Sequence, residues 1–489
     1  MANETIAIYA PIHKNAVMDK RRKICLTIAL ISTLAFAYMS FSLASAVQGT
    51  SGYVTDEIWY VSSSRNILRE IYEVQPSYID SDGGHHYTVF FSSHYELSKA
   101  QANFRNFVET NLGGEITHEY DKVAAFSIVT YRKLDYDTIL DSYAGIKIIQ
   151  SGFNYPDASN IGNYMNTEHP PLAKYTIGLS MLVAGDQPIN WRIPGVIFGS
   201  LTLLFVYLTA VKLINNEIIP LFVYLFAFTD PVFRAMTAAA MLDIYAAFFI
   251  ALSVWLALRR NYFLSALAIG LASACKFTGA FSVFALFVFM VYGRKTSVKK
   301  LIVYPFIVPI IIWLSSNAPL IIKLGPHRWF NELLSGLSWF ATSRPPGPPV
   351  SSPWGWFVNQ APFMLNANPN VFASVNPVVY AMALAALVLI PFLAHKIRRE
   401  SLGPALWFIC TFVGYVALYL VGNTTQYSYY IVTLSPMAYV LACMLFYYIW
   451  EKSQQYKGLM LPWKKRRPIK RKRNASKPKI TKKTILGLD

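Results

Sequence analysis

The feature that most constrains this chain is a series of long apolar runs separated by short polar turns. A bilayer core requires about 20 apolar residues of helix, and several of the runs reach that length. Charged residues make up only 14% of the chain, and its mean hydropathy is +0.35. The sequence therefore predicts a polytopic α-helical membrane protein with about ten transmembrane helices. The predicted spans are residues 24–46, 191–213, 217–230, 241–258, 262–275, 279–292, 301–323, 376–395, 403–421 and 430–450.

The first run has a second interpretation, because a basic segment precedes it and small residues end it, as in a secretory signal. The run of residues 24–46 is longer than the apolar core of a signal and matches the length of a membrane span. We interpret it as the first transmembrane helix.

Basic residues set the predicted orientation. The formal net charge is +18, but residues 464–483 contain twelve Lys and Arg and no acid, which leaves about +6 elsewhere. Positive charge favours the cytoplasmic side of a membrane, so both termini are predicted to be cytoplasmic in a cell membrane. The tail can bind anionic headgroups; a nucleic-acid or protein partner is the alternative, and we expect no nucleic acid. The other basic turns are Lys212, Arg259, Arg260, 293–300 and 395–400.

One apolar segment is too short to cross the membrane upright. Residues 171–186 include about fourteen apolar residues, and their charged members are Lys174 and Asp186, which suits a helix lying at the interface. Two large segments, residues 47–190 and 324–375, are then external.

The first external segment has the pattern of a small α+β module. Strand-like and helix-like stretches alternate in the order β-α-β-β-α-β, which predicts a ferredoxin-like insert at residues 80–157. The later segment is rich in Pro, Gly and Trp and is predicted to be an ordered surface loop. The predicted parts are a cytoplasmic N-terminus (1–23), the first transmembrane helix (24–46), an acidic-motif segment (47–79), the insert (80–157), an interfacial segment (158–190), transmembrane helices (191–323), the external Trp/Pro-rich loop (324–375), further transmembrane helices (376–450) and a basic cytoplasmic tail (451–489).

Polar residues from distant segments are predicted to meet at the external ends of these helices. Ionisable groups at that depth are costly, so a cluster of them indicates function. Most of them have a structural alternative as well: a solvated acidic pair or local salt bridge, helix capping by His169, an interface anchor at Arg192, a structural acid at Asp243, and a snorkelling Lys276. The candidates are Asp56, Glu57, His169, Lys174, Arg192, Asp243, Lys276 and Trp354.

Taken in order, these motifs resemble the protein O-mannosyltransferases of the GT-C superfamily. That family has an Asp-Glu pair in its first external loop, an HPPLxK segment, a WR(L/I)P segment, an LD at the head of a later span, and a Lys followed by Gly. The corresponding segments here are "DE" (56–57), "HPPLAK" (169–174), "WRIP" (191–194), "LD" (242–243) and "KFTG" (276–279). Weaker similarity lies around Trp354 and in the Tyr-rich segment 427–442.

The resemblance covers residues 24–72 and 165–450, and it has two departures. The insert is not part of the usual family pattern, and residues 324–375 are too few for the large sugar-binding-type domain of eukaryotic members. The chain therefore resembles a compact prokaryotic-type member with a GT-C type fold.

The resemblance implies transfer of a sugar, mannose in this family, from a polyprenyl (dolichyl) phosphate to a Ser/Thr hydroxyl of a protein, in a single inverting displacement at the external face. A carboxylate can serve as the general base, for which Asp56 is the first choice, with Glu57 orienting the reactants. Fixed cations stabilise a departing phosphate. The predicted phosphate ligands are Arg192, Lys174 and Lys276; the predicted sugar or acceptor ligands are His169, Asp243 and Trp354.

No cofactor is required by this reading, although a divalent ion, Mg²⁺ or Mn²⁺, is an open alternative with Asp56 and Asp243 as its candidate ligands. The predicted partners are the lipid donor, a protein acceptor and membrane lipid. The competing functions are a GT-C transferase with a lipid or glycan acceptor, a transporter whose charges line a path, and a sensor or adhesion protein.

Overall fold

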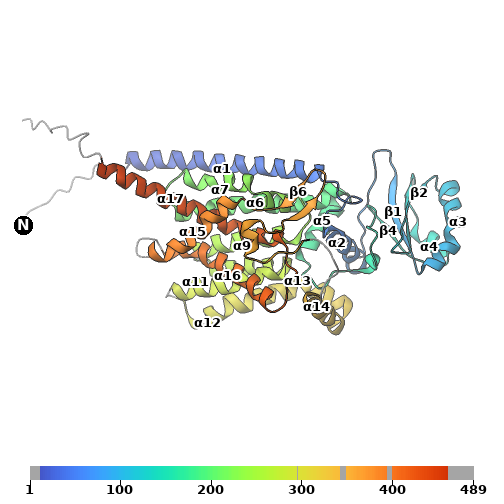
Figure 1. The fold of residues 1–489 in the computed structure, drawn as a ribbon. Coiled ribbons are helices and arrows are strands. Elements are labelled where there is room, and N and C mark those ends of the chain that lie inside the picture. The colour runs from blue at the N-terminus through green and yellow to red at the C-terminus, as the bar shows by residue number, and fades with distance from the viewer. Residues whose placement is uncertain (1–11, 294–295, 342–348, 394–398, 461–489) are drawn as a thin grey trace, which may run out of the picture. The chain divides into compact units, whose positions relative to one another are not determined.

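The computed structural model describes residues 12–293, 296–341, 349–393 and 399–460, and Figure 1 shows its fold. The basic segment 464–483 lies outside the described residues, as do parts of the predicted basic turns. The chain divides into two compact units, Met1–Tyr447 and Tyr448–Asp489, and apart from the end of helix α17 (Ser435–Met460) the features below belong to the first.

Each of the ten predicted spans contains a helix. The bounds differ by several residues at some ends, as expected where helix ends depend on caps rather than on apolar length. The helices are α1 (Ile12–Ala46), α6 (Pro188–Leu213), α7 (Phe222–Thr229), α9 (Leu242–Leu258), α10 (Tyr262–Cys275), α11 (Ser282–Tyr292), α13 (Val308–Leu324), α15 (Pro377–Leu393), α16 (Leu402–Leu420) and α17 (Ser435–Met460).

Fewer of these helices are long enough to cross a bilayer alone. Within the described residues, four helices pass by length and apolar composition, and a fifth passes if α7 is joined to α8 (Pro231–Thr237) across a 74° bend. Several membrane-length helices make this a multi-pass membrane protein, whereas the count of ten stays a prediction. The four helices are Lys20–Ala46, Pro188–Leu213, Val298–Leu324 and Leu402–Leu420.

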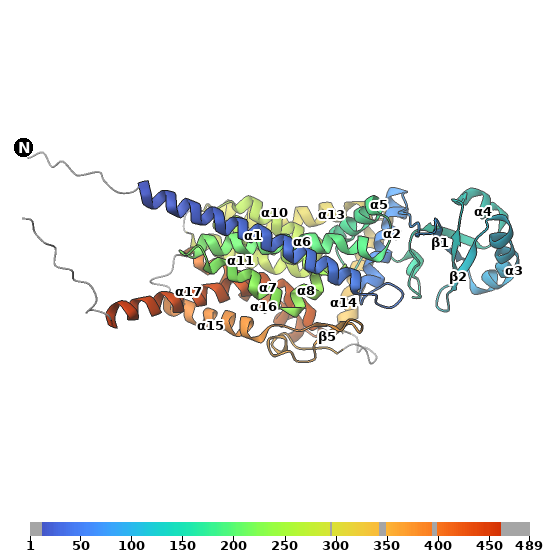
Figure 2. The same ribbon diagram turned by 90° about the horizontal axis from the view of Figure 1, so that it is seen from above.

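The helices pack along one another in an order set by the chain. α6 packs along α1 and α9, α9 along α10, and α10 along α13; both ribbon views show α1 beside α6 (Figures 1 and 2). α10 is rich in small residues, and its Ala266, Ala272 and Ala274 are fully buried. Small side chains let neighbouring helices approach closely, which is typical of membrane bundles.

A helix that the apolar pattern did not predict follows the acidic pair directly. α2 (Glu57–Tyr72) buries a continuous polar stretch, residues 62–66, so its interior does not have the apolar period that identifies helices in a sequence. The predicted interfacial segment contains α5 (Leu172–Ala184), which packs against α2 and α6.

The predicted insert has the predicted element order. Its strands form one antiparallel sheet in the order β2-β3-β1-β4, and every neighbouring pair is antiparallel. Helix α3 begins after Ser93, whose side chain accepts a hydrogen bond from the Glu96 amide, as an N-cap does. The elements are β1 (His85–Phe91), α3 (His94–Asn111), β2 (Glu115–Glu119), β3 (Ala125–Thr130), α4 (Tyr136–Ser142) and β4 (Ile146–Ser151).

Both faces of this sheet are covered. α3 and α4 lie on one face, as Figures 1 and 2 show, and enclose a core that includes Phe104 and Phe126. On the other face, Phe90 packs with Tyr155 and with Ile58 and Trp59 of α2. The sheet therefore rests on the helix that starts at the acidic pair.

Residues 324–375, predicted to be an external surface loop, have more regular structure than that prediction gave them. It contains α14 (Pro326–Ala341), the single helical turn η5 (Gly355–Val358), and a two-stranded hairpin of β5 (Phe363–Asn366) and β6 (Val371–Ala373). Residues 342–348 lie outside the described residues. The prediction of an ordered segment therefore missed a helix and a hairpin whose short strands have little alternation to detect.

Candidate functional site

The two adjacent carboxylates, Asp56 and Glu57, have different environments at the start of α2. Glu57 is fully buried, whereas Asp56 is half-buried. Thr55, directly before them, has a positive φ of 49°. A β-branched residue is strained there, and such strain is often found beside functional groups. The turn thus sends two neighbouring carboxylates in separate directions.

Glu57 forms a closed ion pair with Arg192 of α6. Glu57 Oε1 accepts from Arg192 Nε at 2.8 Å, and Oε2 accepts from Nη2 at 2.7 Å. The same oxygens also accept from the Ala240 and Val54 amides. The remaining Arg192 donors bind backbone carbonyls of Ala44, Val47 and Gly52. All five guanidinium N–H groups are used, so the predicted phosphate ligand Arg192 is fully engaged within the protein.

A second ion pair, between Asp243 and Lys276, is open. Lys276 Nζ lies 2.6 Å from Asp243 Oδ1, and both side chains are almost completely buried. Asp243 Oδ2 is buried with no hydrogen-bond partner among the described residues. The Lys276 ammonium faces the ring of Tyr430 at 4.1 Å and that of Tyr429 at 5.7 Å. One carboxylate oxygen therefore has unused hydrogen-bonding capacity.

Helix geometry explains why this acid and this base meet. Asp243 lies in the first turn of α9, and Lys276 follows the last residue of α10, which packs along α9. An acid at a helix start and a cation at a helix end both complement the helix dipole. Gly279 lets the chain turn back over α10, since a Cβ there would lie 2.4 Å from the Ala272 carbonyl carbon. The Lys-Phe-Thr-Gly segment is thus a tight helix end that presents Lys276.

Asp56 faces a group of tyrosines. It occupies the N-cap position of α2, but its side chain makes no capping hydrogen bond. Its Oδ2 instead accepts from Tyr429 OH at 3.0 Å and lies 3.4 Å from Tyr60 OH. Burial, followed by the Asp56 and Asp243 charges, raises the pKa of Tyr60 well above its usual value. Tyr60 therefore remains a neutral donor, and the two acids lie close enough to influence the same ring.

His169 and Lys174 come from the segment that leads into α5. The His169 ring meets the Tyr60 ring edge-on at 5.8 Å. Burial, then the charges of Lys276 and Lys174, lower the pKa of His169 to about 3, so its ring is neutral at physiological pH. Lys174 donates to the backbone carbonyls of Asn166, His169 and Met165 at 2.5, 2.9 and 3.3 Å. An ammonium has three N–H groups, so Lys174 is engaged in folding this loop.

Two tryptophans in residues 324–375 have different surroundings. Trp354, the predicted ligand, is 50% exposed and contacts Tyr419 edge-on. Trp356 is completely buried and packs edge-on against Tyr415 and Tyr430. Since Tyr430 faces Lys276, Trp356 is the tryptophan that supports the open pair. Sequence alone could not show which of the two tryptophans that flank Gly355 lies near the site.

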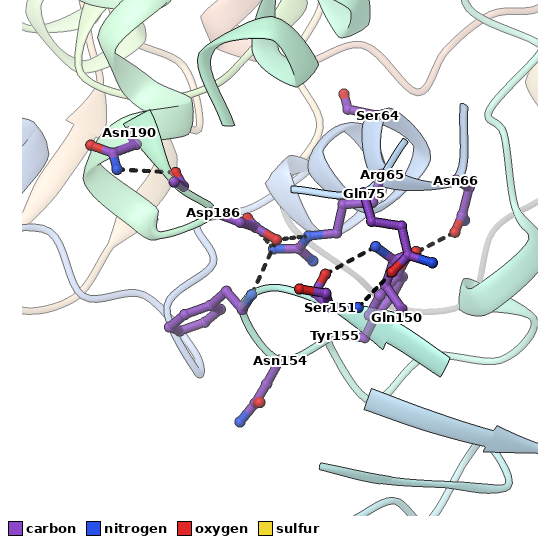
Figure 3. Close-up of polar contacts among 12 residues, drawn as sticks. Ser64, Arg65, Asn66, Gln75, Gln150, Ser151, Asn154, Tyr155, Asp186 and Asn190 are labelled. Atoms are coloured by element: carbon purple, nitrogen blue, oxygen red, sulfur yellow. Dashed lines mark hydrogen bonds and ion pairs between the residues drawn. The ribbon is translucent and has the colours of Figure 1, made fainter. Parts of the chain in front are cut away.

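A buried network fixes the middle of α2 (Figure 3). Arg65 donates to both oxygens of Asp186 at 2.6 and 2.9 Å, and neither side chain is exposed. Asp186 also accepts from the Phe153 amide, and Tyr155 OH donates to Asn66. Burial raises the pKa of Asp186 while Arg65 opposes that shift. The network joins α2 to the end of the insert and to the turn between α5 and α6.

Glycine makes part of that network possible. Gly152 has a φ of 120°, and a Cβ there would lie 2.2 Å from Asp186 Oδ2. Only glycine brings the backbone close enough for the adjacent amide to reach the carboxylate without a clash.

The donor set does not fit a divalent ion held by the protein alone. Among the described residues, no group of three His, Cys, Asp or Glu side chains converges. Of the two predicted ligands, Asp243 already has the Lys276 ammonium at 2.6 Å. A cation is therefore built into the site as a side chain.

The structure brings four of the eight candidates together around the tyrosines: Asp56, His169, Asp243 and Lys276. Glu57, next to Asp56 in the chain, binds Arg192 instead. Arg192 and Lys174 lie nearby but bind protein groups, and Trp354 is outside this cluster. Sequence reasoning missed the individual tyrosines, although the Tyr-rich segment 427–430 was the signal that could have identified two of them. The missed residues are Tyr60, Tyr429, Tyr430 and Trp356.

Comparison with known families agrees with the resemblance read from the motifs. Residues 168–319 match the family described as dolichyl-phosphate-mannose-protein mannosyltransferase. That segment includes His169, Lys174, Arg192, Asp243 and Lys276 but not the acidic pair. The resemblance predicted from the motifs is therefore confirmed over this part of the chain.

A curated relative gives a similar result over a shorter stretch. The polyprenol-phosphate-mannose–protein mannosyltransferase of Corynebacterium glutamicum is 35% identical over 91 residues, which cover 19% of this chain and 18% of that relative. Among solved structures, ArnT from Cupriavidus metallidurans bound to undecaprenyl phosphate has a TM-score of 0.44 at 16% identity, over 60% of this chain and 53% of that one. Its apo form has a TM-score of 0.43 at 15% identity over the same shares of the two chains.

Proposed function

We propose that this protein is a polyprenyl-phosphate-sugar-dependent glycosyltransferase of the GT-C type, which transfers a sugar to a protein hydroxyl at the external face of the membrane. The family match over residues 168–319 supports the class of enzyme and makes mannose the favoured sugar. The observation that carries the proposal is the open cluster: a partly accessible carboxylate, Asp56, beside a buried pair whose second acid oxygen has no partner.

The reaction has a simple balance of bonds. An acceptor hydroxyl oxygen attacks the anomeric carbon, a new carbon–oxygen bond forms, and the bond to the lipid phosphate breaks. The hydroxyl proton goes to Asp56, and the phosphate leaves with the bonding electrons. General-base catalysis of this kind contributes roughly 10²–10⁴-fold to rate. Tyr429 and Tyr60 hold the Asp56 carboxylate in place through their hydroxyls.

Lys276 is the cation we assign to the departing phosphate. Three cations were candidates, but Arg192 and Lys174 have their N–H groups occupied by protein oxygens. Lys276 donates one hydrogen bond to Asp243, and its ammonium also faces the rings of Tyr429 and Tyr430. A fixed ammonium in a water-poor site stabilises developing negative charge strongly.

Asp243 and His169 are assigned to sugar and acceptor contacts. Asp243 Oδ2 is positioned to accept a hydrogen bond from a sugar hydroxyl, which would satisfy its buried lone pairs. His169 is a neutral ring in this proposal and therefore offers one donor and one acceptor. Glu57, Arg192 and Lys174 are positioning residues that shape the loops carrying these groups.

The test is a transfer assay with purified protein. Labelled polyprenyl-phosphate mannose is incubated with Ser/Thr-containing peptides or with a lipid extract, and the products are identified by mass spectrometry. We expect labelled peptide from the native protein and a loss of about 10³-fold in Asp56→Asn at an unchanged melting temperature. We also expect transfer to persist in a chelator.

Three results would contradict parts of the proposal. Labelling of lipid alone would contradict the assignment of a protein acceptor. Near-native activity in Asp56→Asn would contradict the assignment of Asp56 as the general base. Loss of activity in the chelator, restored by Mg²⁺, would show that a metal ion takes part.

A further inference from the structure

A small cavity lies apart from the cluster described above, between α1, α8 and the β5–β6 hairpin. Its volume is about 200 Å³, which equals the liquid-state share of several water molecules at about 30 Å³ each. None of its lining residues belongs to the proposed site. They are Met39, Ser40, Leu43, Pro231, Arg234, Ala235, Asn370, Val371 and Phe372, and we call this cavity the α1–α8 pocket.

Two polar groups in the α1–α8 pocket have no partner among the described residues. Ser40 is completely buried, and its hydroxyl makes no hydrogen bond. Arg234 is partly buried, and its Nε is likewise buried without an acceptor. A buried hydroxyl or guanidinium N–H without a partner is unfavourable, so a ligand that satisfies both would bind favourably.

The nearby acid does not neutralise Arg234 by contact. Asp230 lies one turn before it, but its carboxylate accepts from Tyr439 OH at 2.6 Å, Tyr380 OH at 3.1 Å and the Asn376 amide at 3.0 Å. Among the described residues, Arg234 forms no ion pair. The guanidinium therefore has donors to offer an anion.

The walls of the α1–α8 pocket are fastened to one another. The Val232 amide donates to the Ser374 carbonyl at 2.8 Å, which joins α8 to the hairpin. The Gly49 amide donates to Asn366 Oδ1 at 3.1 Å, which joins the same hairpin to the segment after α1. The pocket is thus a built feature of three tied elements rather than a gap at a loose surface.

Position and lining define the kind of ligand. Ser40 lies six residues before the end of α1, about 9 Å along a helix with a rise of 1.5 Å per residue. α1 is long and apolar enough to span a bilayer, so this depth is where hydrocarbon meets headgroups. Most of the lining is apolar, and its polar members are Ser40, Arg234 and Asn370. Arginine pairs with phosphate through parallel N–H groups.

We propose that the α1–α8 pocket binds the phosphate group of a membrane lipid, with Arg234 and Ser40 as its ligands. The site is separate from the reaction centre and does not depend on the proposed activity. The phosphate belongs either to a phospholipid headgroup or to a polyprenyl phosphate.

The test measures lipid retention by the full-length protein in detergent, using native mass spectrometry. The probes are phosphatidylglycerol, undecaprenyl phosphate and dioleoylglycerol, which has no phosphate. Arg234→Met removes the charge but keeps an apolar stem, and Ser40→Leu fills the pocket without touching the charge. Arg259→Met is the matched control, because Arg259 is exposed and stacks on Trp255 at 4.8 Å, away from the α1–α8 pocket.

We expect each pocket variant to weaken retention of a phosphate lipid by roughly tenfold, with Arg259→Met unchanged and dioleoylglycerol insensitive to every variant. Loss confined to phosphatidylglycerol identifies a phospholipid site, and loss confined to undecaprenyl phosphate identifies a polyprenyl phosphate site. Equal retention by native protein and both variants would overturn the proposal, as would an equal loss in Arg259→Met. Ser40→Leu keeps the test decisive if Arg234→Met does not fold.

Discussion

Two buried acid–base pairs flank the start of α2, and they are built in opposite ways. In the Glu57–Arg192 pair, each carboxylate oxygen accepts two hydrogen bonds and every guanidinium donor is used. In the Asp243–Lys276 pair, one contact of 2.6 Å joins the partners and Asp243 Oδ2 has no partner among the described residues.

This difference indicates that the Glu57–Arg192 pair is structural and that the Asp243–Lys276 pair takes part in the reaction. Burying an ion costs several kcal/mol unless its hydrogen-bonding groups are satisfied, and the Glu57–Arg192 pair satisfies all of them. The Asp243–Lys276 pair leaves that cost partly uncompensated. A fold that keeps an unsatisfied buried acid beside a partly accessible Asp56 keeps it for a bound partner, because an apolar pair of similar volume would be as stable or more so.

Removing the cation from the open pair should have the largest effect. Lys276→Met keeps the apolar stem but removes the charge assigned to the departing phosphate, so we expect kcat to fall by about 10²–10³-fold. The matched control is Lys174→Met, an equally buried lysine whose ammonium binds backbone carbonyls. Lys174→Met should act mainly on stability: the melting temperature falls, and the activity per folded molecule falls less than in Lys276→Met. Equal losses of kcat in the two variants would contradict the assignment of Lys276, rather than Lys174, to the departing phosphate.

The two tryptophans give the next largest effect. Trp356 supports Tyr430 behind Lys276, so Trp356→Ala should lower the free energy of unfolding by about 3–5 kcal/mol. Trp354 is half-exposed, and Trp354→Ala should change the free energy of unfolding by about 0.5 kcal/mol or less. Denaturant unfolding of both variants measures this. A larger loss of unfolding free energy in Trp354→Ala than in Trp356→Ala would contradict the assignment of Trp356 as the supporting ring.

The smallest effect concerns His169, which lies near both Lys276 of the open pair and Lys174, whose ammonium binds backbone carbonyls. Its folded-state pKa of about 3 is below the unfolded value of about 6.5. Between these values the unfolded chain binds the extra proton, so stability rises with pH through this window and falls on acidification. Melting temperatures from pH 7 to pH 4 should drop less in His169→Asn than in the native protein. Identical slopes would show that His169 titrates normally in the folded protein.

Much of the helical framework could be predicted from sequence, for physical reasons. Apolar runs of bilayer length have few alternatives to helix, and the short strands of the insert alternate clearly enough to give their order. The motifs also located Asp56, Asp243 and Lys276, because ionisable residues at helix ends within apolar runs are conspicuous.

What could not be predicted depends on partners distant in the chain. α2 was missed because its buried stretch, residues 62–66, is polar and is satisfied only by groups such as Asp186 and Tyr155. The hydrogen-bond partners of Arg192 could not be predicted either, since they include three backbone carbonyls that only the folded loops bring together. A sequence shows that a residue is charged but not which of its hydrogen bonds are already used.

The most direct measurement replaces each pair as a whole and records melting temperature and transfer rate together. Glu57→Leu with Arg192→Met leaves five backbone groups without their partners, at about 1–3 kcal/mol each. Asp243→Leu with Lys276→Met removes the hydrogen bond between the two side chains, in which no backbone group takes part. We predict that the first double variant does not fold and that the second melts like the native protein but transfers sugar at least about 10²-fold more slowly. A first double variant that folds and melts normally, or a second that keeps native activity, would contradict the account.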